Sequence, residues 1–367
     1  MPQVRQRRDL RRSLAHAVAA IALALPAVAA HASAQRTFVS PNGADANTAS
    51  NCSLSAPCRS FGAAITVTNA SGEIIVLDSA GYGAVTIAKS VSIISPPGIY
   101  AGVSVLTGEG ITIDTAGVEV TLKGLTVNGQ GGTVGIHFSQ GSRLDIDGCT
   151  VSNMGQQGIL VDGAGTVSIA NTTVVGNTDI GIEVDAAAVV TIADSVVEAN
   201  GSHGVAAEGG ASMTIAGTTI VKNAQKGVFV QGVAAGTRLA MTSSVVSDQA
   251  SGAGLYAEAL SAGDVVRLDV TNTTLARNAT GVQVNSIASG NAKAGVVNNQ
   301  IVENPVAGIL AQGSGSSVIR ASRNAVFRNG VGLSTTGGGV IYSPSTNYVR
   351  DNTTDTSVGT PAADSLL

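Results

Sequence analysis

A glycine followed by an aliphatic residue recurs nine times along this chain at nearly constant intervals. The pairs are Gly135-Ile136, Gly158-Ile159, Gly181-Ile182, Gly204-Val205, Gly227-Val228, Gly254-Leu255, Gly281-Val282, Gly308-Ile309 and Gly332-Leu333. Successive glycines are about 23 residues apart four times, about 27 apart three times and then about 24 apart. A fixed period in this range is typical of stacked units, each too small to bury its own apolar face. The interval lengthens after Gly227, so we expect longer turns in the later coils, where a binding face can differ from the scaffold.

Each repeat contains three short apolar segments. The first, Gly-Ile-x-Val, alternates apolar and variable residues, as a strand with one buried face does. The second is an apolar-polar-apolar triplet such as Val167-Ser168-Ile169, and the third has the form Thr/Ser-aliphatic-x-x-Asn, as in Thr173 to Asn177. Leucine is too scarce for a leucine-rich repeat, and the hairpin signals of an antiparallel sandwich are missing. The pattern predicts an all-β right-handed parallel β-helix of about eleven coils, with three short strands per coil.

The repeats do not begin at the first residue, which divides the chain into four parts. Residues 1–34 read as a signal peptide, and residues 35–72 as an N-terminal cap with a disulfide loop and a short helix at Arg59–Thr68. On this helix Phe61, Ala64, Ile65 and Thr68 share a face. The parallel β-helix is predicted over residues 73–352, followed by a loose C-terminal tail at 353–367.

The N-terminal segment has the composition of a secretory leader. A basic region contains Arg5, Arg7, Arg8, Arg11 and Arg12, and an apolar stretch from Leu14 to Ala30 leads to a cleavage site at Ala32-Ser33-Ala34. A membrane anchor is the alternative, but the stretch is broken by Pro26 and is shorter than a spanning helix requires. The arginine pair leaves Sec and twin-arginine export both open. We expect a secreted or periplasmic protein with no membrane span in the mature chain.

Removal of the leader makes the chain more acidic. The formal net charge is −4, and the mature part has 15 basic and 23 acidic residues, a net charge near −8. Nucleic-acid binding needs a basic footprint, so the charge disfavours it. The acidic balance is compatible with a surface that binds cations or that keeps the protein soluble.

Three cysteines are available for bonding. Cys52 and Cys58 lie close together in a loop, and an exported protein can form a disulfide between them. Cys149 remains, and we expect it to be a small buried apolar residue rather than a reactive thiol.

Taken together, the sequence resembles the secreted bacterial members of the pectate-lyase-like β-helix superfamily. The resemblance lies in the repeats and in an N-terminal segment with these matching residues: Phe38-Val39-Ser40, Gly43-Ala44-Asp45, Ala56-Pro57-Cys58-Arg59, Phe61, Ala64-Ile65, Gly72-Glu73-Ile74 and Gly81-Tyr82. The resemblance implies that the short helix plugs the open N-terminal end of the solenoid, where bare strand edges would otherwise aggregate. It is specific for architecture, because this fold carries many functions.

Equivalent residues of successive coils stack about 4.8 Å apart, so candidate sites are sought as columns of such residues. The aliphatic columns are core. A column of asparagines comprises Asn177, Asn200, Asn223, Asn278, Asn304 and Asn329, with Asp248 substituting once. Stacked amides bond up and down such a column, and asparagine tolerates left-handed backbone. We interpret it as a structural asparagine ladder rather than a ligand site.

The fourth residue after each glycine forms a polar column that points outward. It contains Ser139, Asp162, Asp185, Glu208, Gln231, Glu258, Asn285 and Gln312. Asp162, Asp185 and Glu208 follow one another, and Glu183 lies beside Asp185 on the same strand, so these four are the candidate glycan-binding or cation-binding face. Neighbouring carboxylates repel by about 0.2–1 kcal/mol, and a row of them can recruit Ca²⁺ or present acceptors to sugar hydroxyls. The alternative is a solvent-facing strand end.

Two histidines remain after processing. His203 lies one coil beyond Asn177-Thr178-Asp179, an arrangement similar to the N-T-D and G-H-G motifs of polygalacturonases, but Ser202 replaces the first glycine and the paired aspartates are missing. Asp179 and His203 are therefore weak candidates for the acid–base pair that a glycosidase needs. His137 is expected to be an exposed strand residue.

No signature of pectate lyases or alginate epimerases is present, and aromatic residues are few. We therefore favour a non-catalytic, monomeric solenoid that binds a glycan or a cell-surface partner along one face, with no cofactor. The second hypothesis is a polysaccharide lyase, hydrolase or epimerase that acts on an acidic polysaccharide through the Asp162, Glu183, Asp185 and Glu208 face, with Ca²⁺ as the one cofactor under consideration.

Overall fold

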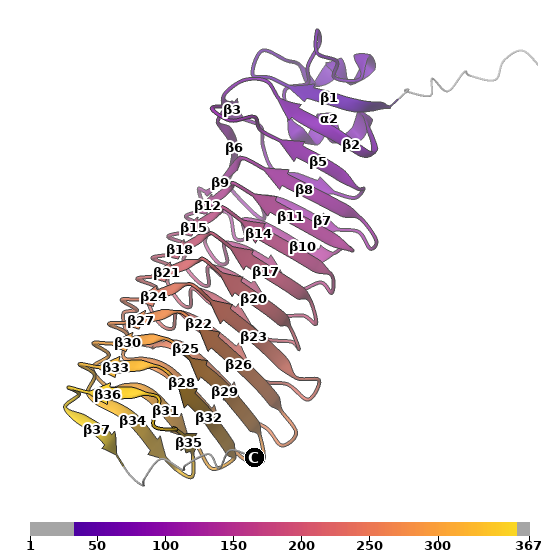
Figure 1. Ribbon diagram of the computed structural model, residues 1–367. Helices are drawn as coiled ribbons and strands as arrows, with labels where there is room; N and C mark the ends of the chain where they lie inside the picture. Colours follow the sequence, from indigo (N-terminus) through magenta and orange to yellow (C-terminus); the bar gives the residue numbers. More distant parts are fainter. Residues whose placement is uncertain (1–32, 358–367) are drawn as a thin grey trace, which may run out of the picture. The chain divides into compact units, whose positions relative to one another are not determined.

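The predicted solenoid is present in the computed structural model, which describes residues 33–357. Its strands stack in parallel into three sheets, and the chain passes through one strand of each sheet per coil (Figure 1). The predicted signal peptide lies outside the described residues, apart from Ser33 and Ala34. No helix in the described part of the chain is long and apolar enough to cross a membrane.

We name the three sheets I, II and III. Sheet I has 13 strands, which are β1 (Ala34–Val39), β2 (Thr68–Val76), β5 (Val91–Ile94), β8 (Glu119–Lys123), β11 (Arg143–Asp147), β14 (Thr166–Ala170), β17 (Val189–Ala193), β20 (Ser212–Ala216), β23 (Thr237–Thr242), β26 (Val265–Thr271), β29 (Asn291–Val297), β32 (Ser316–Ser322) and β35 (Val340–Tyr342). It contains the apolar-polar-apolar triplets of the repeat.

Sheet II holds the Gly–aliphatic segments in 12 strands, which are β4 (Val85–Ile87), β7 (Ile111–Asp114), β10 (Ile136–Gln140), β13 (Ile159–Val161), β16 (Ile182–Val184), β19 (Val205–Ala207), β22 (Val228–Gln231), β25 (Ala253–Ala259), β28 (Thr280–Ser286), β31 (Ala307–Gln312), β34 (Val331–Thr336) and β37 (Thr354–Ser357). Sheet III holds the third segments in 12 strands, which are β3 (Ala80–Gly81), β6 (Ala101–Val105), β9 (Leu125–Gly129), β12 (Thr150–Ser152), β15 (Thr173–Val175), β18 (Val196–Glu198), β21 (Thr219–Val221), β24 (Val245–Ser247), β27 (Thr274–Ala276), β30 (Gln300–Val302), β33 (Ala325–Phe327) and β36 (Tyr348–Arg350). The solenoid has about twelve coils, one more than predicted.

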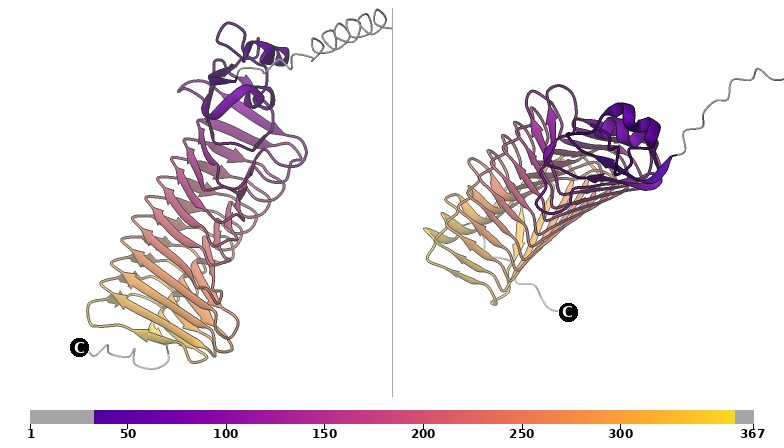
Figure 2. Two further views of the ribbon diagram at one scale, coloured as in Figure 1. Left: turned by 90° about the vertical axis from the view of Figure 1, so that its right-hand side faces the viewer. Right: turned by 90° about the horizontal axis from the view of Figure 1, so that it is seen from above.

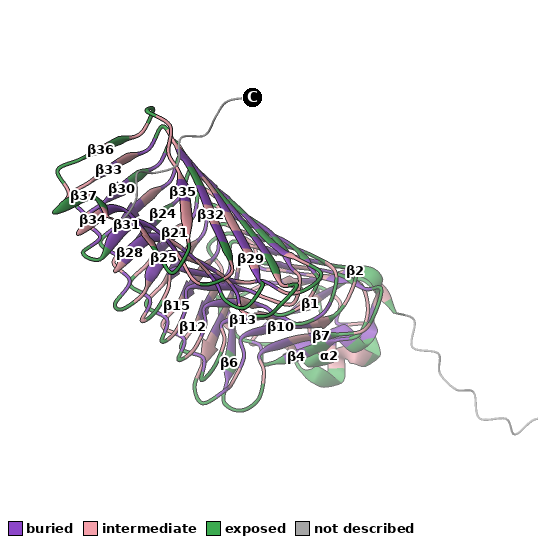
Figure 3. Ribbon diagram, turned by 90° about the horizontal axis from the view of Figure 1, so that it is seen from below, coloured by how far each residue is buried: buried purple, intermediate pink, exposed green. Residues whose placement is uncertain are grey.

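The aliphatic column of sheet II lies in the core, as predicted. Ile136, Ile159, Ile182, Val205 and Val228 are fully buried and belong to one core with buried residues of the other two sheets. Figure 3 shows buried positions, in purple, along the strands. The in-register pairing of equivalent residues keeps each apolar position on the inside from coil to coil. The core is therefore a continuous apolar column rather than a separate cluster for each coil.

The N-terminal end is covered by the predicted helix, α2 (Phe61–Val67), together with the short 3₁₀ helix η1 (Asp45–Ser50). Ser60 caps α2 by accepting a hydrogen bond from the N–H of Ala63 at 3.1 Å. Phe61 is fully buried, and its ring lies 5.2 Å from that of Tyr82. The view from above in Figure 2 shows these helices at the N-terminal end of the coils.

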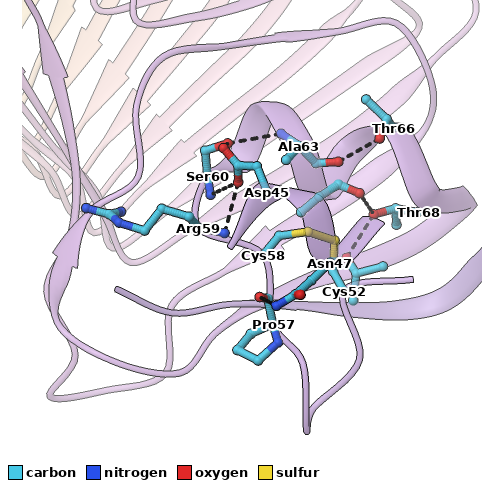
Figure 4. The surroundings of a disulfide bond; sticks show 12 residues. Asp45, Asn47, Cys52, Pro57, Cys58, Arg59, Ser60, Ala63, Thr66 and Thr68 are labelled. Carbon is cyan, nitrogen blue, oxygen red and sulfur yellow. Dashed lines mark hydrogen bonds between the residues drawn. A yellow bond between two sulfur atoms is a disulfide. The ribbon is translucent and has the colours of Figure 1, made fainter. Parts of the chain in front are cut away.

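The predicted disulfide between Cys52 and Cys58 is present, and both residues are fully buried (Figure 4). Backbone hydrogen bonds tie each cysteine to Phe38 of β1. The Asp45 carboxylate accepts the N–H groups of Arg59 and Ser60 at 3.0 and 2.9 Å, so the loop is anchored before the helix begins. Cys149 is 2% exposed, and burial raises the pKa of its thiol to about 11, as expected of an unreactive core residue.

We expect reduction of this disulfide to lower the free energy of unfolding by about 2 kcal/mol, because the bond closes a short loop and the chain-entropy gain grows with loop length. Urea unfolding with and without dithiothreitol measures the difference. A Cys52→Ala/Cys58→Ala double variant should show the same loss and no response to the reductant. A wild-type unfolding free energy that dithiothreitol leaves unchanged would contradict a stabilising role for the bond.

The asparagine ladder is confirmed, with one correction. The backbone N–H of each ladder residue donates to the side-chain oxygen of the ladder residue one coil later, as from Asn177 to Asn200 at 3.2 Å. Where Asp248 was predicted, Gln249 occupies the ladder and accepts the N–H of Asn223 at 2.9 Å. Asp248 instead has a φ of 61° and forms a surface ion pair with Arg277 at 2.6 Å. Gln249 stands four residues after the first residue of β24, as Asn223 does after the first residue of β21, so the strand register places Gln249 and not Asp248 in the ladder.

The left-handed backbone was also assigned to the wrong residue. The residue before each ladder residue has the positive φ, as at Ala199 and Lys222, so the ladder asparagines are selected by their amides.

A second polar ladder, at the turn between sheets I and III, was not predicted. It consists of Thr172, Ser195, Thr218, Ser244, Thr273, Asn299, Asn324 and Asn347. Its mixed residue types conceal the repeat, because any short side chain with an oxygen accepts the N–H from the coil before it.

The C-terminal boundary of the solenoid lies later than predicted. Strand β37 pairs in parallel with β34, with Val331 opposite Thr354 and Ser334 opposite Ser357. Residue 352 is therefore not the last residue of the β-helix, and the tail predicted from 353 contains a strand of sheet II. The short polar sequence of β37 lacks the aliphatic alternation by which the other strands were recognised.

Candidate functional site

Two columns of outward-facing side chains run along sheet II. One is the predicted polar column at the fourth position after each glycine, in which Gln231, Glu258, Asn285 and Gln312 are aligned by strand pairing. The other, at the second position, contains Thr112, His137, Leu160, Glu183, Ala206, Phe229, Tyr256, Gln283, Leu310 and Ser334. Of this second column, only His137 and Glu183 were expected from the sequence to face outward.

Aromatic rings stack in the second column at the middle of the sheet. The Phe229 and Tyr256 rings are 6.0 Å apart and inclined by 15°, and the His203 ring lies 5.0 Å from Phe229 on the other side. Ile180 and Ala206 complete a small apolar cluster on this outer face. Lys226, in the turn before β22, places Nζ 5.0 Å from the Phe229 ring centre and 4.9 Å from that of Tyr256. Such cation–π contacts hold the lysine against the stack.

A groove of about 510 Å³ begins where the aromatic stack ends. Tyr256 forms its wall, and Gln283, Leu310 and Gln312 of the next two coils line it further along the sheet. Phe229 stacks on Tyr256 from the preceding coil, and Gln283 is the strand partner of Tyr256 in the following coil. Strands β22, β25 and β28 lie side by side here (Figure 1), in the coils where the glycine interval lengthens.

Polar groups surround the ring that walls the groove. Asn285 Nδ2 donates to the Tyr256 hydroxyl oxygen at 3.1 Å, and Glu258 lies beside the same hydroxyl. Burial, with the nearby Glu258 charge, raises the pKa of Tyr256 to about 12, so this side chain is a neutral phenol. Burial also lowers the pKa of Lys226, an effect that the Glu258 carboxylate partly offsets. An apolar ring among a few convergent polar groups is the usual composition of a ligand site.

The predicted acidic face is brought together in part. Burial raises the pKa of Glu208, and the charges of Asp185, Glu183 and Glu258 add to the effect, so these carboxylates do neighbour one another. Glu183 accepts a hydrogen bond from Gln157 Nε2 at 2.6 Å, and burial raises its pKa as well. Within residues 33–357, no three His, Cys, Asp or Glu side chains are grouped so that they could hold a metal ion.

Asp162, the first member of that face, is held by a histidine. His137 Nε2 lies 3.0 Å from Asp162 Oδ1, and Nδ1 lies 2.8 Å from Glu109 Oε1. The expectation that His137 is exposed is wrong, because its side chain is only 15% exposed between these two carboxylates. A tenth pair, Gly110-Ile111, places Glu109 just before the glycine of the preceding coil, and extending the repeat by this one pair would have found the contact.

The weak acid–base candidates do not form a pair. His203 is 9% exposed, and burial followed by the Lys226 charge lowers its pKa to about 4. Its Nδ1 accepts the N–H of Lys226 at 3.3 Å, so the neutral ring serves as packing for Phe229. Asp179 is half-buried in its turn, and within residues 33–357 no hydrogen bond or ion pair joins its side chain to His203. His203 is thus a packed residue rather than the variable turn residue that the sequence suggested.

Comparison with known proteins addresses the fold. A family model described as right handed beta helix region matches residues 109–263, in agreement with the architecture above. No curated protein matches the chain. Similar solved structures include pectate lyase Pel9A (14% identity, 92% of this chain and 82% of that one, TM-score 0.47) and a rhamnogalacturonan lyase (11%, 90% and 90%, 0.49). A third is the A-module of the Azotobacter vinelandii mannuronan C-5 epimerase AlgE4 (14%, 80% and 90%, 0.46). Similarities at this level carry no argument about activity.

Proposed function

We propose that this protein is an extracytoplasmic, non-catalytic β-helix that binds a glycan chain in the groove of sheet II beside Tyr256. The observation that carries the proposal is the Tyr256 ring in the lining of a groove that the amides of Gln283 and Gln312 also line. Sugar rings present an apolar face and a rim of hydroxyl groups. An aromatic plane with amide donors and acceptors around it matches both features.

The surroundings of the ring support a binding role because they hold the site in one shape. Phe229 and His203 stack behind Tyr256, and Asn285 donates to its hydroxyl, so little side-chain entropy is lost when a ligand binds beside the ring. The groove lies on paired strands of a long sheet, and sites on rigid elements keep their geometry better than sites on loops.

Location outside the cytoplasm is supported by two features. The first 34 residues have the composition of a secretory leader. The Cys52–Cys58 disulfide is of the kind that persists in oxidising compartments. Both features are compatible with a protein that meets polysaccharide at or beyond the cell surface.

Tyr256→Ala is expected to weaken glycan binding at least tenfold, which corresponds to about 1.4 kcal/mol, because the substitution removes the stacking surface of the groove. Affinity electrophoresis across soluble polysaccharides, followed by calorimetry on those that bind, measures the effect. The matched control is Tyr348→Ala, which removes a 57% exposed tyrosine on sheet III and should leave binding unchanged.

Two outcomes would contradict the proposal. Equal affinities of the wild type and Tyr256→Ala for every polysaccharide that binds would place the site elsewhere. Release of reducing ends or unsaturated products from any of the polysaccharides would show an enzyme, and the lyase, hydrolase or epimerase hypothesis would then replace the non-catalytic one.

A further inference from the structure

The charged residues of the solenoid are divided unevenly among its faces. No strand of sheet II contains a lysine or an arginine, whereas sheet I carries Arg36, Lys123, Arg143, Arg238, Arg267, Lys293 and Arg320 on its strands. The outer side of sheet II carries Asp162, Glu183, Asp185, Glu208 and Glu258, and the basic residues beside it, Lys226 among them, lie in the turns that enter its strands. A ligand that lies along sheet II therefore meets a face with an excess of negative charge.

Inside the groove the charges are balanced. Lys226 and Glu258 both line it and act on each other electrostatically. The ammonium group of Lys226 lies over the Phe229 and Tyr256 rings, within 5.0 Å of both ring centres, so it is already engaged. The remaining polar groups of the lining are amides and hydroxyls, such as Gln283, Gln312 and Thr280. These groups suit hydroxyl-bearing sugars without requiring charge on the ligand.

Negative charge next to the groove is not neutralised by the protein. Among residues 33–357, Glu183, Asp185 and Glu208 form no ion pair with a lysine, arginine or histidine. Burial raises the pKa of Glu208. The charges of Asp185, Glu183 and Glu258 raise it further, because like charges repel. Each carboxylate of an acidic polysaccharide would add to this repulsion, and a neutral chain would not.

On these grounds, and resting on the function proposed above, we infer that the glycan of the sheet II groove is uncharged and hydroxyl-rich, and that Glu208 and Glu258 exclude acidic sugars. Glu258 acts within the groove and Glu208 two coils away in the same outward column. Like charges placed against an unwanted ligand are a means of specificity that needs no extra contact with the preferred one.

The inference is tested with pairs of polysaccharides that share a backbone and differ in charge. Suitable pairs are polygalacturonate with its methyl ester, and carboxymethyl cellulose with hydroxyethyl cellulose, with chitosan as a cationic member. In EDTA and low salt, the wild type should bind the neutral member of at least one pair tenfold or more tightly than the acidic member. The ratio of the affinity for the neutral member to that for the acidic member should fall in 1 M salt. The Debye length there is about 3 Å, so the repulsion is screened.

A Glu208→Gln/Glu258→Gln double variant should bind the acidic member more tightly than the wild type does, narrowing the ratio to about threefold or less. The matched control is Glu119→Gln/Asp269→Asn on sheet I, which makes the same change in net charge and should preserve the wild-type ratio. An unchanged ratio in the first variant would overturn the assignment of Glu208 and Glu258.

The outcomes separate this inference from the function on which it rests. Binding of an acidic polymer or chitosan as tightly as any neutral one, with or without added calcium, would overturn the inference of an uncharged ligand. If that binding were still weakened by Tyr256→Ala, glycan binding in the groove would stand. If no polysaccharide binds, both are overturned.

Discussion

Asn200→Ala is expected to lower the free energy of unfolding by about 3 kcal/mol or more, because it removes one member of the buried asparagine ladder. Asn200 Oδ1 accepts both the backbone N–H and the side-chain amide of Asn177, at 3.2 and 2.9 Å, and its Nδ2 donates to Asn223 at 2.9 Å. Asn177 is 1% exposed, so its two donors would be left without a partner and without water. Urea unfolding followed by circular dichroism measures the loss.

The control for Asn200 is Asn128→Ala on β9. The Asn128 amide oxygen accepts only side-chain donors, from Ser152 at 3.2 Å and Asn153 at 2.7 Å, in a partly exposed position. Its loss should change the unfolding free energy by no more than about 0.5 kcal/mol. Because each coil contacts only its neighbours, amide exchange in Asn200→Ala should increase first in β15, β18 and β21. Similar losses in the two variants would argue against a specific role for the ladder.

Gly204→Ala is expected to destabilise the fold by about 3 kcal/mol, because the position has no room for a methyl group. A Cβ at Gly204 would lie 2.7 Å from each of three atoms: Asn223 Nδ2, the Gly227 carbonyl oxygen and Ile220 Cγ2. Two of these belong to the ladder and to the backbone of the next coil, so neither can move without disturbing the stacking. Equilibrium unfolding in urea provides the measurement.

The comparison for Gly204 is Gly62→Ala in helix α2. The nearest atom to a Cβ at Gly62 is Ser60 Oγ, at 4.0 Å, and the backbone there is helical. Alanine is favoured over glycine at such a position, so we expect an increase in stability of about 0.5–1 kcal/mol. If Gly204→Ala were as well tolerated as Gly62→Ala, the repeated glycine would have to be explained by something other than close approach of the coils.

The contacts at the repeated glycines explain why the fold could be predicted from the sequence. At Gly158, Gly181, Gly204 and Gly254 the space that a side chain would fill is taken by a ladder amide and by a carbonyl oxygen of the next coil. The same steric requirement recurs in every coil, so it leaves a periodic mark on the sequence. The N-terminal helix could be predicted as well, because its cap Ser60 and its buried face of Phe61, Ala64 and Ile65 lie close together in the sequence.

The errors concern residues whose partners lie in an adjacent coil. Gln249 takes the ladder position expected for Asp248 because it stands four residues after the start of β24, as Asn223 does after the start of β21. His137 was expected to be exposed because its partner Glu109 belongs to a coil that had not been recognised as a repeat. In both cases the surroundings of the side chain depend on a residue of the adjacent coil: Asn223 for Gln249 and Glu109 for His137.

The groove illustrates the same limit for function. Lys226 and Phe229 are separated from Tyr256 and Glu258 by a strand of each of the other two sheets, and no local motif links the two pairs. Had the second position after each glycine been compared as the fourth was, the stacked pair Phe229 and Tyr256 would have been visible as a column. Whether this pair lies at a groove would still have depended on the side chains that surround the Tyr256 ring in the folded protein.

The sequence by itself determined the parallel β-helix, the capping helix, the disulfide, the core position of the aliphatic columns and the structural role of the asparagine column. These features follow from requirements that repeat in every coil or that act between residues close in the chain. The tertiary structure alone decided that His203 packs behind Phe229, that Lys226 lies over the two rings, and that a groove opens beside Tyr256. Those features depend on the sizes and directions of side chains about 25 residues apart, which meet only when the coils are stacked.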